Sequence, residues 1–129
     1  MADLAIYLSY PEPAPVIDWL QILGFRIVVR NEEGGRVNHC EMRRGDAVVM
    51  LAVDDAQYTR PPLLGASTGV GAYLVVEPME VDELYAAAVA RGGQGVFAPE
   101  ETAWGARRAR VLDPGGREWT FGSYRPGEG

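Results

Sequence analysis

Hydrophobic residues recur along the first half of the chain at spacings that predict one helix and four strands. Short apolar runs indicate strands, whereas apolar residues three or four positions apart indicate the buried face of a helix. The predicted elements are a strand at residues 4–8, a helix at 16–23, and strands at 25–30, 39–43 and 47–52. Polar and glycine residues cluster at residues 31–35, so we expect a turn there.

The same order of elements returns after a stretch rich in proline and glycine. This second set comprises a strand at residues 72–76, a helix at 81–89, a strand at 95–98, a loop at 99–105, and strands at 107–112 and 118–121. We therefore expect one α+β domain of 129 residues, with two βαβββ modules that form a curved mixed sheet. The helices would cover the convex face and leave a concave cleft. Module 1 is predicted at about residues 1–55, the linker at about 56–69 and module 2 at about 70–124.

Alternation along each predicted strand assigns side chains to a core face and a cleft face. The expected core residues are Leu4, Ile6, Leu8, Cys40, Met42, Val49, Leu51, Ala72, Leu74, Val76, Ala109, Val111, Trp119 and Phe121. The expected cleft residues are Ala5, Tyr7, Ser9, His39, Glu41, Arg43, Val48, Met50, Ala52, Tyr73, Val75, Arg108, Arg110, Glu118 and Thr120. Trp104 stands in the predicted 99–105 loop, where it would either cover the cleft or lie exposed or in an interface.

Charge and cysteine content narrow the function classes. The formal net charge is −6, which disfavours binding to nucleic acid or to an anionic membrane surface. No apolar run is long enough to span a bilayer, and the N-terminus lacks the features of a signal peptide, so we expect a cytoplasmic protein. Cys40 is the only cysteine and His39 the only histidine, which leaves no intrachain disulfide and no cysteine-based zinc site within one chain.

Two stretches resemble a known family. Residues 111–122 contain an Asp-Pro-Gly-Gly turn that enters the last predicted strand, and residues 17–25 contain a helix that ends in Leu-Gly-Phe. Together with the order of elements, these stretches resemble the vicinal oxygen chelate superfamily. That group includes glyoxalase I, extradiol dioxygenases, fosfomycin-resistance enzymes and bleomycin-binding proteins. The resemblance covers almost the whole chain and implies the fold more strongly than any one activity.

The resemblance also implies where a metal ion would be held. Metal-dependent members place one His or Glu on each of four strands, and these positions fall near Ala5, Met50, Gly71 and Thr120. None of these residues is a usual ligand for a divalent ion of that kind. The chain therefore resembles the metal-free binding branch of the family, whose members are acidic homodimers that sequester a drug in clefts between subunits. We expect no metal and no other cofactor.

The leading hypothesis is a non-catalytic protein that sequesters an antibiotic or metabolite in a dimer cleft. The candidate cleft residues are Tyr7, His39, Glu41, Met50, Tyr73, Trp104, Arg108, Glu118 and Thr120. Aromatic side chains would stack on the ligand, and the two glutamates would favour cationic groups. Arg107, Arg108 and Arg110 would either clamp an anion or form ion pairs on the surface, and the acidity of the chain favours ion pairs.

The alternative is an enzyme of the glyoxalase or dioxygenase type, acting as a lyase, isomerase or dioxygenase. His39, Glu41 and Glu118 are its candidate catalytic residues, either as acid and base or as a non-standard metal site. His39 and Glu41 share a strand face because they are two residues apart. A solvated polar strand explains the same pair without any chemistry, and we favour that interpretation.

Overall fold

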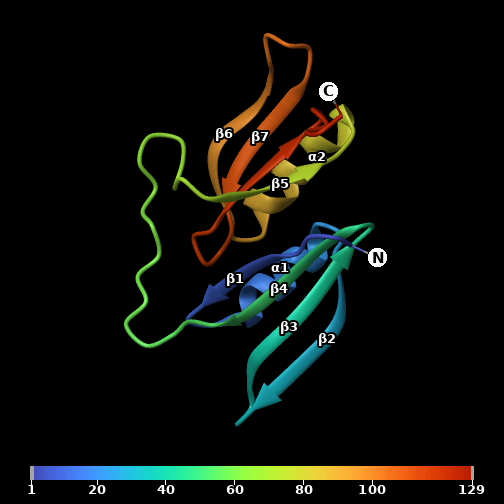
Figure 1. The fold of residues 1–129 in the computed structure, drawn as a ribbon. Helices are drawn as coiled ribbons and strands as arrows, with labels where there is room; N and C mark the ends of the chain where they lie inside the picture. Colours follow the sequence, from blue (N-terminus) through green and yellow to red (C-terminus); the bar gives the residue numbers. More distant parts are fainter. Residues whose placement is uncertain (1, 129) are drawn as a thin grey trace. The chain divides into compact units, whose positions relative to one another are not determined.

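A computed structural model describes residues 2–128 and divides the chain into two compact units, residues 1–60 and 61–129. Each unit contains one βαβββ module, as the repeated sequence pattern predicts (Figure 1). Each module forms its own four-stranded mixed sheet. The α+β class and the two βαβββ modules are thus confirmed.

Module 1 is built from one parallel and two antiparallel strand pairs. Its elements are β1 (Ile6–Tyr10), α1 (Ala14–Ile22), β2 (Arg26–Glu33), β3 (Arg36–Arg44) and β4 (Ala47–Val53), with strand order β1-β4-β3-β2. Strand β1 pairs in parallel with β4, while β3 pairs antiparallel with both β2 and β4. Helix α1 packs against β2 and β3. The core contains Trp19 and Leu20 of the helix and Cys40, Met42 and Leu51 of the strands, all buried.

Helix α1 ends where the sequence predicts, because Gly24 adopts a positive φ of 98°. The backbone N–H of Phe25 donates to the carbonyl of Leu20 at 3.0 Å, and that of Gly24 donates to Gln21 at 3.1 Å. This pair of bonds is a Schellman motif, which a glycine at the left-handed position makes easy to form. The motif turns the chain directly into β2.

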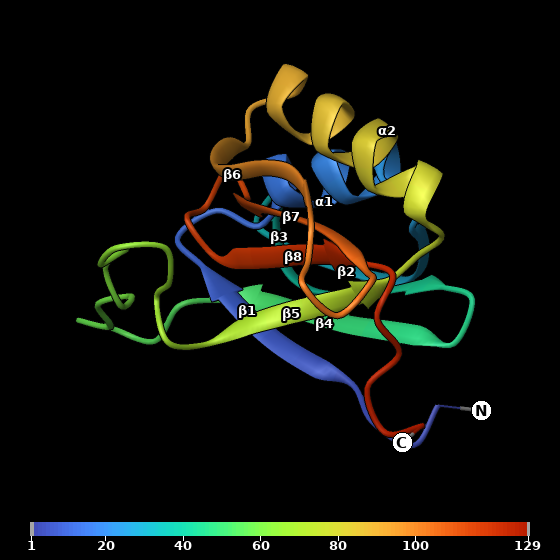
Figure 2. The same ribbon diagram turned by 90° about the horizontal axis from the view of Figure 1, so that it is seen from above.

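Module 2 repeats the arrangement. Its elements are β5 (Gly71–Val75), α2 (Pro78–Ala90), β6 (Gln94–Glu101), β7 (Arg107–Leu112) and β8 (Glu118–Gly122), with strand order β5-β8-β7-β6. Helix α2 packs against β6, β7 and β8 and lies along one face of this sheet (Figure 2). Under it are the buried residues Ala109, Val111, Trp119 and Phe121, as strand alternation predicts. The opposite face of the sheet therefore carries the alternate residues of each strand.

Several strand boundaries differ from the expected ones. Leu4 was expected in the core, but β1 begins at Ile6 and Leu4 is 85% exposed, because no strand pairs with it. The turn expected at residues 31–35 comprises only Gly34 and Gly35. Both have a positive φ, which two-residue hairpin turns favour. The ladder thus continues through polar residues up to the Glu33–Arg36 pair.

The loop expected at residues 99–105 is also shorter. Strand β6 continues to Glu101, because Glu100 and Glu101 pair in register with Arg108 and Arg107 of β7. Opposite charges across a ladder stabilise such an extension. Polar composition alone suggested a loop, whereas the cross-strand partners make it a strand.

The closing turn before β8 depends on one buried carboxylate. Asp113 is almost fully buried, and its Oδ1 accepts hydrogen bonds from the backbone N–H groups of Gly115 and Arg117, both at 2.9 Å. Its Oδ2 accepts a bond from Nε1 of the core residue Trp119 at 3.0 Å. The aspartate of the Asp-Pro-Gly-Gly turn therefore shapes the turn and fixes the indole that follows it.

We predict that Asp113→Ala lowers the free energy of unfolding by about 2–3 kcal/mol, because it removes the carboxylate that accepts bonds from the buried Trp119 indole and from two backbone N–H groups of the turn. Chemical denaturation followed by tryptophan fluorescence measures the change. Asp46→Ala is the control, since its side chain is 97% exposed in a turn and its loss should cost less than about 0.5 kcal/mol. Equal effects of the two substitutions would contradict this account of Asp113.

Candidate functional site

The open face of the module 2 sheet carries a pocket of about 110 Å³. Tyr73 of β5 lies opposite Thr120 of β8, which lies opposite Arg110 of β7, so these side chains form a row across three strands. The residues lining the pocket are Tyr73, Thr102, Trp104, Ala106, Arg107, Arg108, Arg110, Thr120 and Tyr124. Tyr73, Trp104, Arg108 and Thr120 of the predicted cleft set are thus brought together here.

Trp104 reaches the pocket from a tight turn between β6 and β7. The backbone N–H of Thr102 donates to the carbonyl of Ala106 at 2.8 Å, and the N–H of Ala106 donates to Oγ1 of Thr102 at 2.9 Å. Gly105 adopts a positive φ of 80° within this turn. These bonds hold the turn closed, and the indole of Trp104 remains 61% exposed.

Two arginines of β7 stack on aromatic rings beside the pocket. The guanidinium carbon of Arg108 lies 5.1 Å from the ring centre of Phe97 and 5.4 Å from that of Trp104. That of Arg110 lies 5.1 Å from Phe97. Arginine on an aromatic face is attracted by the ring quadrupole, so the rings help to orient both cations. Nε of Arg108 also donates to Glu100 at 3.1 Å.

Glu118 is predicted in the cleft, but it does not line this pocket. It is only 6% exposed and forms an ion pair with Arg110, at 3.3 Å from Oε2 to Nε. Its Oε1 accepts bonds from Oγ of Ser67 at 3.0 Å, and from N and Oγ1 of Thr68 at 2.7 and 3.0 Å. Burial raises the pKa of Glu118, but these hydrogen bonds and the charge of Arg110 outweigh it, so the pKa lies below its ordinary value.

Glycines make room for two side chains on this face. A Cβ atom on Gly71 would lie 2.9 Å from Oε2 of Glu118, and one on Gly122 would collide with the phenol of Tyr73. Tyr73 therefore crosses β8 at a residue without a side chain and donates its hydroxyl to the carbonyl of Tyr124 at 3.0 Å. Burial raises the pKa of Tyr73, so the phenol stays protonated at neutral pH.

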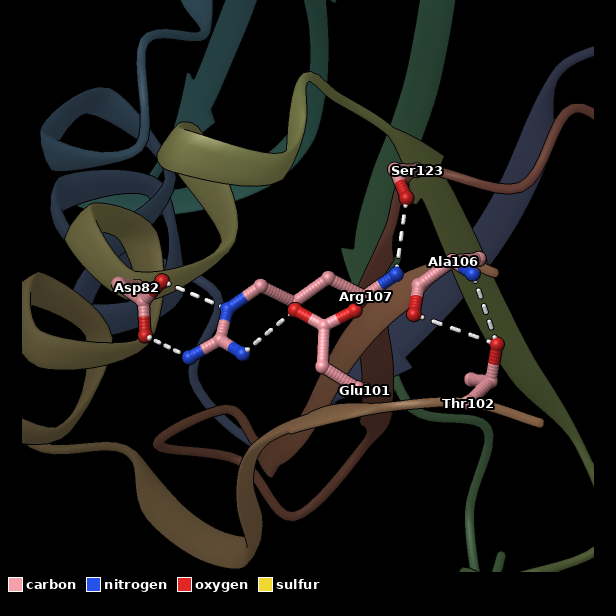
Figure 3. A network of polar contacts seen from close by, with 6 residues as sticks. All are labelled: Asp82, Glu101, Thr102, Ala106, Arg107 and Ser123. Atoms are coloured by element: carbon pink, nitrogen blue, oxygen red, sulfur yellow. Dashed lines mark hydrogen bonds and ion pairs between the residues drawn. The ribbon is translucent and has the colours of Figure 1, made fainter. Parts of the chain in front are cut away.

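Arg107 lies at the edge of the pocket, but its donors serve other parts of module 2 (Figure 3). Nε and Nη2 donate to the two carboxylate oxygens of Asp82 on α2, both at 2.8 Å, and Nη1 donates to Glu101 on β6 at 3.1 Å. The backbone N–H of Arg107 donates to Oγ of Ser123 at 2.9 Å. The hydrogen bond from Arg107 lowers the pKa of Asp82, and the same bond raises the pKa of Arg107. Arg107 thus connects a helix, two strands and the segment after β8.

Module 1 brings its predicted site residues together on its own sheet. Met50 of β4 lies between Tyr7 of β1 and Glu41 of β3 in the strand register. His39 Nε2 lies 2.8 Å from Oε2 of Glu41, and both side chains are about one-third exposed. A register shift after Asn31, the partner of His39, marks a bulge beside this pair. Tyr7 is exposed at the edge of the same sheet.

Some residues of the site were missed or undervalued from the sequence. Arg110 was expected on the cleft face with Arg108 but was not among the candidate site residues. Both arginines form ion pairs, as the acidity of the chain favoured, and both also line the pocket. Tyr124 follows Thr120 with the same period of two, a signal that could have identified it. Ser67 and Thr68 lie in the linker, and nothing in their local sequence indicates a partner 50 residues away.

The sequence matches a known protein-family model over most of its length. The model of the Glyoxalase/Bleomycin resistance protein/Dioxygenase superfamily matches residues 10–121. The chain belongs to this superfamily. No curated protein matches it significantly.

Solved structures share the fold of this chain. TioX from Micromonospora sp. ML1 is 26% identical, with a TM-score of 0.71 over 96% of this chain and 100% of TioX. A FosX variant from Listeria monocytogenes, in complex with Mn(II) and dihydroxypropylphosphonic acid, is 14% identical, with a TM-score of 0.71 over 98% and 94%. A bleomycin-binding protein in complex with bleomycin is 18% identical, with a TM-score of 0.64 over 97% and 100%.

The described part of the chain lacks a cluster of metal-binding side chains and a helix that could span a membrane. Residues 2–128 contain no group of three or more His, Cys, Asp or Glu side chains placed to hold a metal ion. Neither helix described there is long and apolar enough to cross a membrane.

We predict that Glu118→Gln destabilises the protein by about 1–3 kcal/mol at pH 7, because the ion pair with Arg110 loses its negative charge. The folded state depresses the pKa of Glu118, so its contribution to stability is present above the ordinary value near 4.5 and is lost as pH falls through the folded-state pKa. The difference in the free energy of unfolding between wild type and variant should therefore shrink as the pH falls below about 4.5. Urea denaturation from pH 3 to 8 measures it, with the exposed Glu83→Gln as control. A gap that is constant with pH would contradict this interpretation.

Proposed function

We propose that the protein is a non-catalytic small-molecule binder that sequesters an antibiotic or metabolite, acting in the cytoplasm as a homodimer. The observation that carries this proposal is the module 2 pocket, which combines aromatic walls with arginines in fixed positions. Concave sites with aromatic walls and a few oriented polar groups are typical of ligand binding. Homodimerisation and the sequestering role follow from the resemblance to bleomycin-binding proteins.

The polar groups of the pocket support binding more than chemistry. The Tyr73 hydroxyl donates to a backbone carbonyl, and the Thr120 hydroxyl accepts a bond from Arg110. Arg107 is occupied by two carboxylates. General acid–base catalysis needs a group that titrates near the working pH and reaches the substrate. The lining contains no histidine and no carboxylate.

The residues of this face do not fit a divalent metal ion. Gly71 and Thr120 stand near two positions where the resemblance places metal ligands, and Gly71 has no side chain. Thr120 Oγ1 instead lies 2.9 Å from Nε of Arg110, a permanent cation that would repel a metal ion there. Both oxygens of the nearby Glu118 already interact with protein groups. This donor set supports the metal-free interpretation.

The relatives illustrate both possible uses of the fold. The bleomycin-binding protein was solved with its drug, and FosX was solved with Mn(II) and a phosphonic acid. The pocket chemistry described above resembles drug binding more than metal-dependent catalysis. This chemistry supports the proposed binding role.

A metal-independent lyase or isomerase is the second candidate, and one observation favours it. His39 and Glu41 lie 2.8 Å apart on a sheet face of module 1, next to the exposed Tyr7. A carboxylate at that distance orients an imidazole, and a general base needs a fixed orientation to reach its substrate. The partial exposure of both groups weakens this effect and leaves binding as the better-supported role.

We predict that a screen of drug-like compounds finds ligands that raise the melting temperature of the protein and quench Trp104 fluorescence. Trp104→Ala and Tyr73→Ala should each weaken such a ligand about tenfold or more, because aromatic burial and stacking supply much of the affinity. Tyr58→Ala is the matched control, since it removes an exposed aromatic residue that does not line the pocket. Ligands that tolerate both pocket substitutions would refute the assignment of the site.

We also predict less than about one-tenth of a metal ion per chain, a level too low for a catalytic metal. The measurement is elemental mass spectrometry of untagged protein purified without chelators and offered Mn, Fe, Co, Ni and Zn. Near-stoichiometric binding of one metal, lost in His39→Ala and Glu41→Gln, would instead favour the enzyme alternative.

A further inference from the structure

We infer that the module 2 pocket selects aromatic carboxylic acids, with the ring on Trp104 and the carboxylate on Arg108. This inference rests on the proposed binding function and specifies the class of ligand. It differs from the expectation drawn from the acidic sequence, in which glutamates would favour cationic groups. Three features of the pocket carry it: the ring walls, the free guanidinium donors and the absence of lining carboxylates.

The walls of the pocket fit a flat ring. Trp104, Tyr73 and Tyr124 line it, and all three rings are at least two-fifths exposed. The volume of about 110 Å³ is smaller than the apolar cavity of about 150 Å³ that holds benzene, so the pocket would take part of a single aromatic ring, and the rest of the ligand would lie at its rim. Offset or edge-to-face contacts with such rings add affinity beyond the burial itself.

The three lining arginines differ in how many of their guanidinium nitrogens already donate hydrogen bonds to the protein. Arg107 uses Nε, Nη1 and Nη2 on Asp82 and Glu101, so it is already occupied. Arg110 uses Nε and Nη1. Arg108 uses only Nε, and within residues 2–128 neither Nη1 nor Nη2 of Arg108 has an acceptor. Those two nitrogens form the end of the guanidinium that binds a carboxylate with two parallel hydrogen bonds.

Arg108 is also held in position before any ligand arrives. Its guanidinium stacks on both Phe97 and Trp104, which limits the rotamers that it would otherwise sample. Its ion pair with Glu100 is half-exposed on both sides, and such pairs contribute little. A ligand carboxylate can therefore join or replace Glu100 at small cost. The ring that holds Arg108 in place, Trp104, is the same one that would contact the ligand ring.

The residues that line the pocket offer hydrogen-bond donors to an anion, even though the net charge is −6 and each lining arginine also pairs with a carboxylate outside the lining. Three arginines and no acidic residue line the pocket. Glu118, the acidic residue expected there, is buried against Arg110 and covered by Ser67 and Thr68. A cationic ligand would meet the aromatic rings, but also the Nη1 and Nη2 donors of the positively charged Arg108.

The test titrates ¹⁵N-labelled protein with benzoate, benzamide, benzylammonium and cyclohexanecarboxylate, and follows the indole N–H signals. The chain has three tryptophans, and Trp104→Phe assigns the signal of interest. We expect benzoate to shift the Trp104 signal but not that of the buried Trp119, which donates to Asp113. Benzoate should bind about tenfold more tightly than benzamide, as a charge-assisted bond predicts. The affinity for benzoate should also be about threefold higher than the affinity for cyclohexanecarboxylate, because only benzoate has an aromatic ring to contact Trp104.

Variants separate charge from ring contact. Arg108→Gln should bind benzoate and benzamide with equal affinity. Arg108→Lys should keep part of the preference for benzoate, because lysine keeps the charge but loses the planar guanidinium. Arg91→Gln, at an exposed position that does not line the pocket, should leave the preference unchanged. Trp104→Ala should remove the advantage of benzoate over cyclohexanecarboxylate.

Equal binding of benzoate and benzamide by the wild type, or tighter binding of benzylammonium, would overturn the inference. So would the absence of any shift with benzoate at tens of millimolar. If the panel fails while the drug-like screen yields a ligand that depends on Trp104 and Tyr73, the ligand class is wrong and the binding function stands. If both fail, the binding function itself is wrong.

Discussion

The buried carboxylate of Glu118 needs partners, and the way it obtains them determines the open face of module 2. A buried charge is costly unless it is paired and hydrogen-bonded. Arg110 supplies the opposite charge, and Ser67 and Thr68 supply three hydrogen bonds. In doing so Arg110 also contacts Thr120 and the carbonyl of Ala66. One ion pair thereby fixes the linker end, two strands and one wall of the pocket.

This arrangement has a chemical consequence for the site. Because the guanidinium of Arg110 lies beside Thr120, a cation bound at that hydroxyl would meet a like charge. The same fold holds Mn(II) in the FosX structure, so the fold does not decide the chemistry. The side chains on the open face decide it. Here they are arginines, hydroxyls and aromatic rings.

The sequence predicts the parts of this picture that depend on local period. Alternation placed Trp119 and Phe121 under the helix and Thr120 on the open face, because successive strand side chains point to opposite sides. It could not reveal that Glu118 is covered, because its partners come from the linker. The local sequence predicted a loop at residues 99–105, but pairing with Arg107 and Arg108 extends β6 to Glu101.

The chain carries a net charge of −6, whereas the residues that line its pocket include three arginines and no carboxylate. The acidic partners of Arg107 lie on α2 and β6, and Glu118 lies below the surface of the open face. Each carboxylate therefore holds an arginine in place from outside the pocket. Arg108 differs because its partner Glu100 is exposed and its remaining nitrogens are free of protein acceptors among residues 2–128. A site of this kind can select anions in an acidic protein because short-range hydrogen bonds in a partly dry pocket outweigh a net charge that salt screens over about 8–10 Å.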